Sequence, residues 1–206
     1  MRQTPLLALL IGCAEPIIGD GSLVEDARDL SGFTSVETYG VNARIALGDA
    51  DDVVINTDSN LQPYVLTSVE DGVLRIEADG DLYPTALTAL VVVESLEGIG
   101  NFAGADLWVS GIDGASLDVL ASGVGHTELI GVVDTLNLVS TGSGVRNASE
   151  LTAETVTISM SGAGTAWITA TDSIEGDISS DSTLNVFGDP VRKAVTSDSA
   201  SEVIYY

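Results

Sequence analysis

The chain has 206 residues, of which 31 are acidic and 7 are basic, so its formal net charge at pH 7 is −24. So negative a surface repels nucleic acid and anionic lipid headgroups, and neither is expected as a partner. The chain is nevertheless 45% hydrophobic, which is too high for a disordered acidic tail and sufficient for a folded domain with a real core.

The first thirteen residues have the layout of a secretory signal. Arg2 precedes an apolar run over residues 6–11 that is too short to span a bilayer. The run leads into the letters LIGC at residues 10–13, which resemble a bacterial lipobox, and Cys13 is the only cysteine in the chain. We therefore predict a lipoprotein signal peptide over residues 1–12 and lipidation at Cys13. The alternative is an ordinary signal peptide with a cysteine there by chance.

The predicted domain organisation follows from this start. Residues 13–29 are expected to form the lipidated cysteine and a tether, and residues 30–206 a single head domain. Ala14 is not the aspartate that retains many lipoproteins in the inner membrane, which favours the outer membrane. The expected location is the bacterial cell envelope, with the lipid in the membrane and the head either periplasmic or exposed at the cell surface.

From Phe33 onward the chain consists of short runs in which apolar and polar residues alternate, which is the pattern of half-buried strands. These runs are FTSVETY, ARIAL, DVVINT, YVLTSV, VLRIEA and LTALVVVESL. Glycine-containing turns separate them, and EDG at residues 70–72 predicts a hairpin. No stretch after residue 13 has helical periodicity, so we predict an all-β domain.

The second half of the chain repeats every 19 or 20 residues. Four rows begin at residues 102, 122, 141 and 161, and a degenerate fifth row covers 181–200. Such a period in a chain of strands predicts a β-solenoid, in which each row is one coil and strands of successive coils pair in parallel. The thin aliphatic interior has little room for aromatic side chains, which agrees with an aromatic content of 5%.

Glycines fall into two columns of these rows: Gly123, Gly142 and Gly162, and Gly125, Gly144 and Gly164. A phosphate-binding loop would need a helix or a lysine after the glycines, and neither follows. We therefore assign both columns to the corners of the coil, where the backbone must bend through conformations that glycine adopts at low cost.

Several segments together resemble a known bacterial family. They are GSLVEDARDLSGFTSVETYGVNARIALGD, then NLQPYV and VEDGVLRIEAD, the glycine rows, and NVFGDPVRK. In order and spacing they are similar to the putative auto-transporter adhesin, head GIN domain family (DUF2807), over about residues 21–200. The resemblance implies a right-handed parallel β-helix in lipid-anchored or secreted proteins of Gram-negative bacteria. It implies no established activity and no catalytic residues. FAGA at residues 102–105 departs from the repeated glycine pattern.

Candidate catalytic residues are sparse. His126 is the only histidine and could act as a general base with Ser122 or Asp134, but it follows a corner glycine and is interpreted as a surface residue. Glycosidases need two carboxyl groups at a defined separation. The aspartates of the rows share no column: Asp106, Asp113, Asp118, Asp134, Asp172 and Asp177. We therefore predict no catalytic residues and no enzyme activity.

Two charged clusters stand out in the chain. Asp49, Asp51 and Asp52 form an acidic turn that lacks the glycine and glutamate of an EF-hand loop. We predict no metal site and no cofactor, with weak cation binding at such turns as an alternative. Arg192 and Lys193 form the only basic pair, and we expect them to pair with acidic residues near the last coil and to protect its open strand edge.

Two tryptophans and one asparagine complete the candidates. Trp108 and Trp167 lie early in their rows, where they could stack on sugar rings or pack against the flat face of a coil. Asn147-Ala-Ser149 matches a glycosylation acceptor, a signal that bacteria rarely use.

The predicted function is a non-enzymatic, lipid-anchored envelope protein whose solenoid head serves in adhesion or surface binding. Its membrane contact is the N-terminal lipid, and its ligand is a saccharide or a protein bound at residues that the sequence does not identify. One rival is a polysaccharide lyase or hydrolase, which would need three or more carboxylates in one groove. Another is a structural module of the periplasm, which differs from an adhesin in its location.

Overall fold

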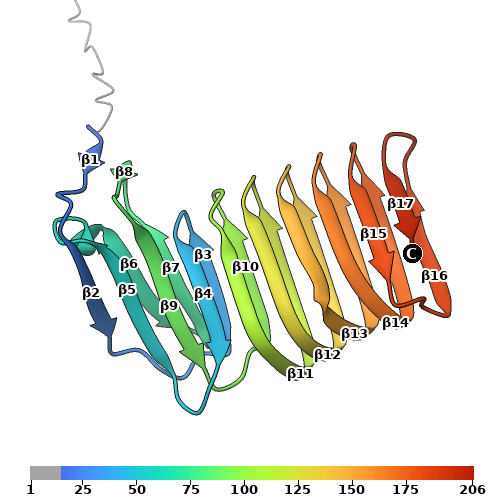
Figure 1. Ribbon diagram of the computed structural model, residues 1–206, viewed down its shortest axis with the longest axis horizontal. Helices are drawn as coiled ribbons and strands as arrows, with labels where there is room; N and C mark the ends of the chain where they lie inside the picture. The colour runs from blue at the N-terminus through green and yellow to red at the C-terminus, as the bar shows by residue number, and fades with distance from the viewer. Residues whose placement is uncertain (1–14) are drawn as a thin grey trace, which may run out of the picture.

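A computed structural model describes residues 15–206, so Cys13 and the expected signal peptide over residues 1–12 lie outside the described part. The chain forms a parallel β-solenoid with about five turns of about 20 residues, as the repeats predicted. The coils lie side by side along the long axis, with the N-terminal strands at one end and the C-terminus at the other (Figure 1). Within residues 15–206 the one helical element is a three-residue 3-10 turn, so no helix there could span a membrane.

Each regular coil is one long strand that bends and contributes to two facing layers (Figure 1). The four long strands are β11 (Leu107–Ser122), β12 (His126–Thr141), β13 (Val145–Ser161) and β14 (Thr165–Ser179). We call the layer formed by their first halves face A and the layer formed by their second halves face B. Each row of the repeat therefore supplies a strand to both layers.

The remaining strands extend these two layers at both ends. Face A continues through β4 (Asn42–Leu47), β9 (Leu87–Val93), β5 (Asp52–Asp58) and β2 (Leu23–Arg28), and on the other side through β15 (Thr183–Phe187) and β17 (Glu202–Tyr205). Face B continues through β10 (Gly98–Phe102), β3 (Ser35–Tyr39), β7 (Val73–Ala78) and β6 (Val65–Glu70), and on the other side through β16 (Arg192–Ser197).

Alternation along each strand builds the core between the faces. In β12 the inward side chains of Leu129, Leu136 and Leu138 are buried, and the corresponding positions of the neighbouring coils are also aliphatic. Fully burying one leucine or isoleucine side chain contributes about 1.5–3 kcal/mol. Because parallel pairing places like positions above one another, these contributions form a continuous aliphatic stack.

The two glycine columns lie at the turns between the long strands. Gly123, Gly142 and Gly162 have φ angles of 98°, 100° and 107°, a region that residues with a Cβ rarely adopt. A Cβ on Gly142 would lie 2.7 Å from the carbonyl oxygen of Gly123 in the preceding coil. A Cβ on Gly125, in the second column, would overlap the carbonyl oxygen of Ala105. The corners therefore need glycine both for backbone conformation and for the close approach of successive coils.

The coils at the N-terminal end are irregular and contain antiparallel pairs. β6 and β7 form the hairpin predicted from EDG, and its turn has positive φ at Asp71 and Gly72. β2 pairs antiparallel with β5, and the short strand β1 (Ile17–Ile18) pairs with β8 (Leu82–Tyr83). Much of the segment expected to be a tether over residues 13–29 is thus paired with the head, because Leu23–Arg28 form a strand along β5 at the end of the sheet.

The buried carboxylate of Asp58 fastens this N-terminal segment. It accepts hydrogen bonds from the backbone N–H of Gly21 at 2.7 Å, and from the N–H and the hydroxyl of Thr85 at 2.6 and 2.9 Å. Burial raises the pKa of Asp58, but the hydrogen bonds outweigh it and hold the pKa below its usual value. Asp58 therefore links three segments that are distant in the sequence.

The basic pair lies at the C-terminal end, as expected. Arg192 contacts Glu175 of the preceding coil at 2.9 Å, and Lys193 contacts Asp189 at 2.9 Å. The Lys193 ammonium also lies 4.9 Å from the centre of the Tyr205 ring. These charges reduce the tendency of the last strands to pair with another sheet edge.

The corner geometry predicts that Gly142→Ala lowers the free energy of unfolding by about 2 kcal/mol or more, since the new Cβ meets both unfavourable φ and the Gly123 carbonyl. Gly114→Ala is the matched control, because Gly114 has no positive φ and a Cβ added there would meet no other atom within 4 Å. Its effect should stay within about 0.5 kcal/mol. Denaturant titration measures both, and equal losses in the two variants would contradict the assignment of Gly142.

Candidate binding face

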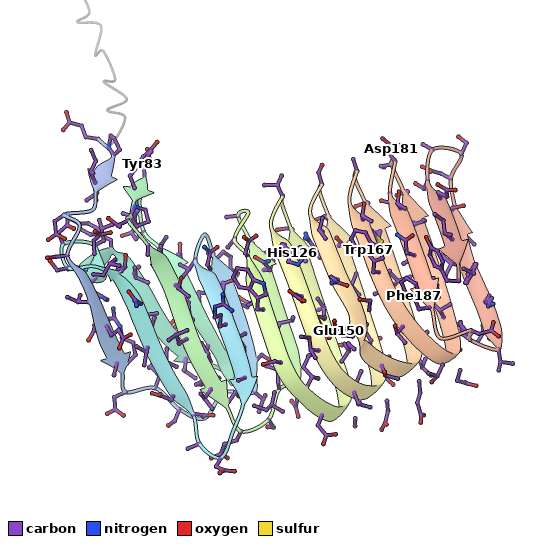
Figure 2. All side chains as sticks on the ribbon, in the orientation of Figure 1. Tyr83, His126, Glu150, Trp167, Asp181 and Phe187 are labelled. Carbon is purple, nitrogen blue, oxygen red and sulfur yellow. The ribbon has the colours of Figure 1, made fainter. Side chains whose placement is uncertain are left out.

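The outward side of face A carries both tryptophans. Trp108 of β11 pairs in register with Glu128 of β12, Glu128 with Asn147 of β13, and Asn147 with Trp167 of β14. These four side chains therefore form one outward column across four successive strands. His126, Trp167 and Phe187 lie on this same face, on β12, β14 and β15 (Figure 2).

Two shallow hollows lie along this column. The first, which we call the Trp108 hollow, has a volume of about 410 Å³ and is bordered by Arg44, Leu90, Trp108, Glu128 and Ile130. The guanidinium carbon of Arg44 lies 4.6 Å from the centre of the Trp108 ring, a cation–π contact that fixes both side chains. This wall of the hollow therefore combines an aromatic ring with a cation.

The second, which we call the Trp167 hollow, has a volume of about 350 Å³ and is bordered by His126, Asn147, Ser149, Trp167 and Phe187. Phe187 is held from behind by Tyr206, since their ring centres are 4.7 Å apart with an angle of 15° between the planes. The hydroxyl of Tyr206 donates a hydrogen bond to Oδ1 of Asn185 at 3.1 Å. Sequence reasoning missed Phe187, although it lies one repeat after Trp167.

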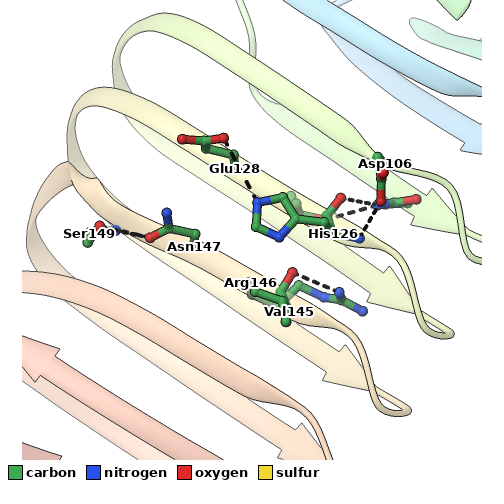
Figure 3. Close-up of polar contacts among 9 residues, drawn as sticks. Asp106, His126, Glu128, Val145, Arg146, Asn147 and Ser149 are labelled. Carbon is green, nitrogen blue, oxygen red and sulfur yellow. Dashed lines mark hydrogen bonds and ion pairs between the residues drawn. The ribbon is translucent and has the colours of Figure 1, made fainter.

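His126 borders the Trp167 hollow, and Glu128 on the same strand borders the Trp108 hollow. The backbone N–H of His126 donates to a carboxylate oxygen of Asp106 at 3.0 Å, and its Nε2 lies 3.9 Å from Oε2 of Glu128 (Figure 3). The side chains of His126 and Glu128 are 35% and 31% exposed. Within residues 15–206, neither Ser122 nor Asp134 is hydrogen-bonded to His126, so the triad that the sequence allowed is not assembled. His126 is instead a half-exposed polar side chain beside Glu128.

A β-bulge in β13 orients Asn147. The register shifts so that Glu128 pairs with Asn147 while Ile130 pairs with Glu150, which leaves one extra residue in β13. Within this bulge, Oδ1 of Asn147 accepts hydrogen bonds from the N–H of Ser149 at 3.2 Å and from its hydroxyl at 2.8 Å (Figure 3). The Asn-Ala-Ser sequence thus has a local structural role: it fixes the amide of Asn147.

Arg146 lies directly behind this part of face A and points into the solenoid. It is 1% exposed, and its Nη1 donates to the carbonyl oxygens of Gly125 and Val145, while its buried Nε has no partner among the described residues. Burial lowers the pKa of Arg146, but a guanidinium remains charged in a protein. The charge is therefore balanced by carbonyl dipoles rather than by a carboxylate.

The acidic residues do not gather into a site. Asp118 and Asp177 lie on face B, whereas Asp106 lies beside His126 on face A. Asp51 of the acidic turn accepts hydrogen bonds from the N–H groups of Gly32 and Glu94, which is a structural role. In the described part of the chain, no group of three His, Cys, Asp or Glu side chains could hold a metal ion.

A larger hollow of about 760 Å³ lies near the N-terminal end, beside the loop that carries Asp81 and Pro84. Tyr39 lines its edge and is stacked on Phe102 at 4.7 Å. The two hollows of face A differ from it, because each has a tryptophan beside charged or amide side chains. They are the stronger candidates for recognition.

Comparisons with known proteins agree with this architecture. A family model described as "Putative auto-transporter adhesin, head GIN domain" matches residues 32–190. A putative adhesin from Bacteroides fragilis is similar in structure, with a TM-score of 0.73 at 19% identity, over 92% of this chain and 100% of that one. A putative adhesin from Parabacteroides merdae has a TM-score of 0.57 at 20% identity, over 94% of this chain and 100% of that one. A putative lipid binding protein from Parabacteroides distasonis has a TM-score of 0.56 at 17% identity, covering 93% and 100%. No curated protein matches.

Arg146 is a buried cation that contacts carbonyl groups and no carboxylate among the described residues. We therefore predict that Arg146→Met leaves the free energy of unfolding unchanged or raises it by about 1–4 kcal/mol, because an apolar side chain avoids the desolvation of a buried cation. Denaturant titration at neutral pH measures the difference. Arg146→Ala is the comparison, and it should be less stable than Arg146→Met because it leaves a cavity. A large loss of stability in Arg146→Met would show that the carbonyl contacts contribute more than this reasoning allows.

Proposed function

Because the chain belongs to the putative auto-transporter adhesin, head GIN domain family, we propose that it is a non-catalytic binding module of the bacterial cell envelope that adheres through face A. The observation that carries this proposal is the outward column of Trp108, Glu128, Asn147 and Trp167. The membrane anchor is a lipid on Cys13, and the outer membrane is the proposed location. Both follow from the sequence around Cys13.

The construction of face A suits binding. Its backbone groups are paired with neighbouring strands, so its outward side chains are held on a rigid sheet. Trp108 is fixed by Arg44, and Phe187 by Tyr206. A ligand that contacts such pre-ordered side chains loses little binding energy to their immobilisation. Face B lacks tryptophan, which favours face A as the contact surface.

An enzyme that cleaves polysaccharides is the rival function. It needs a pair of carboxylates flanking the bond that breaks, whereas the carboxylates of Asp106 and Glu128 are associated with His126 and those of Asp118 and Asp177 lie on the opposite face. The family description as an adhesin also favours binding over catalysis. A structural module of the periplasm is a second alternative. It would have the same lipid anchor and the same fold as an adhesin, but its face A would lie in the periplasm rather than at the cell surface.

The lipobox predicts that Cys13→Ala releases the protein from the membrane. Wild-type protein should sediment with membranes and enter the detergent phase, whereas the variant should be soluble, since lipid chains supply the membrane affinity. Ala14→Ser is the matched control and should remain with the membrane. Membrane fractionation with immunodetection measures this, and a Cys13→Ala protein that still sediments would overturn the anchor.

Adhesion predicts that beads coated with the purified Cys13→Ala protein bind a biological surface saturably. Mucin-coated plates, epithelial cells and bacterial cells are the surfaces to use, and bead retention under flow is the measurement. Heat-unfolded protein on the same beads is the control. Retention equal to this control on all three surfaces would reject the adhesion function. Protease treatment of intact cells then tells a surface adhesin, which is cut, from a periplasmic module, which is protected.

A further inference from the structure

We propose that the Trp167 hollow binds one ring of a neutral saccharide, with the sugar stacked on Trp167 and a hydroxyl group accepting a hydrogen bond from Asn147. The inference rests on the proposed binding function and gives its ligand class. It starts from the side chains that border the hollow: His126, Asn147, Ser149, Trp167 and Phe187.

Trp167 supplies the apolar surface for the ring. Its side chain points outward from β14 and is partly exposed, between Asn147 of β13 and Asn185 of β15. Phe187, stacked on Tyr206, forms a second aromatic wall. A pyranose ring has a face of C–H groups and an edge of hydroxyl groups, so an aromatic surface with polar groups at its border matches both parts.

Asn147 supplies a directed hydrogen-bond donor. Because Oδ1 already accepts two hydrogen bonds from Ser149, the amide orientation is fixed and Nδ2 is left with its two hydrogens. Among the described residues, no acceptor is bonded to this Nδ2. An immobilised donor beside an aromatic ring is a group that a sugar hydroxyl can use. His126 and Glu128 lie one strand away and add a further donor and acceptor.

The charge around the hollow favours a neutral ligand. The cation of Arg146 is buried behind the face, whereas the carboxylates of Asp106 and Glu128 lie on its outer side beside His126, and the whole chain has a net charge of −24. Sulfated or carboxylated sugars would be repelled by these carboxylates. A peptide added as a strand would need a free sheet edge, whereas β13 and β14 are paired on both sides in this region.

The position of Trp108 indicates the direction of the saccharide chain. Trp108 and Trp167 lie three strand spacings apart in one column, which is about 14 Å at about 4.8 Å per strand. An oligosaccharide that occupies both hollows therefore runs across the strands, along the axis of the solenoid. Longer oligosaccharides should bind more tightly than a monosaccharide, because the two contacts act together.

Tryptophan fluorescence tests the proposal, because the chain has two tryptophans and Trp108→Phe leaves Trp167 as the only one. In the Cys13→Ala, Trp108→Phe protein we expect saturable emission changes with at least one of cellohexaose, xylohexaose, mannohexaose and chitohexaose.

Calorimetry on the Cys13→Ala protein, which keeps both tryptophans, gives the affinities. There, Asn147→Asp should weaken binding about tenfold, because it keeps the acceptor for Ser149 but removes the donor, and Trp167→Ala should weaken it at least as much.

Leu120→Ala is the control, since Leu120 is exposed on face B, and it should leave affinity unchanged. Unfolding midpoints of all variants show whether a loss of binding is a loss of folding. No response to any hexasaccharide at millimolar concentration, with coated beads still retained, would overturn the saccharide assignment and leave the adhesion function standing. Binding that survives both Trp167→Ala and Asn147→Asp would overturn the assignment to this hollow. Beads that are not retained would reject the adhesion function itself.

Discussion

The structure depends on the parallel pairing of one coil with the next. Successive coils are therefore separated by the distance between paired strands along both layers. The same short distance separates their backbones at the corners, where the chain turns from face B back to face A. Gly142 shows the consequence, because a Cβ there would lie 2.7 Å from the Gly123 carbonyl oxygen. At the turns of the regular coils, successive backbones therefore approach too closely for a residue larger than glycine.

The same stacking determines how a surface site can be built. Residues one repeat apart in the sequence become neighbours on adjacent strands, so a column such as Trp108, Glu128, Asn147 and Trp167 is assembled from four coils. The core constrains the inward positions, whereas the outward positions can vary without cost to the stack. Local departures then adjust single side chains, as the bulge in β13 does for Asn147. Recognition on such a scaffold is decided by the outward columns.

The two ends of the stack require separate solutions, because a solenoid leaves a strand unpaired at each end. At the N-terminal end, β2 pairs antiparallel with β5, and the buried Asp58 fastens the preceding segment to Thr85. At the C-terminal end, Arg192 and Lys193 place charges beside the last strands. The antiparallel pairs also explain why the first coils do not repeat in the sequence, since their strands are not related by a constant step along the chain.

The sequence by itself determined the all-β class, the repeating coils, the hairpin at Asp71-Gly72 and the glycines of the turns, because each depends on residues that are near one another or separated by a constant period. The resemblance to the adhesin family was likewise readable from ordered local motifs. Tertiary structure alone decided that residues 23–28 complete a sheet, that Arg146 is buried, and that Asn147 is fixed beside Trp167. Those outcomes depend on the bend of each long strand, the register shift in β13 and antiparallel contacts between distant segments. None of these leaves a periodic pattern in the chain, because each is set by packing against a neighbouring coil.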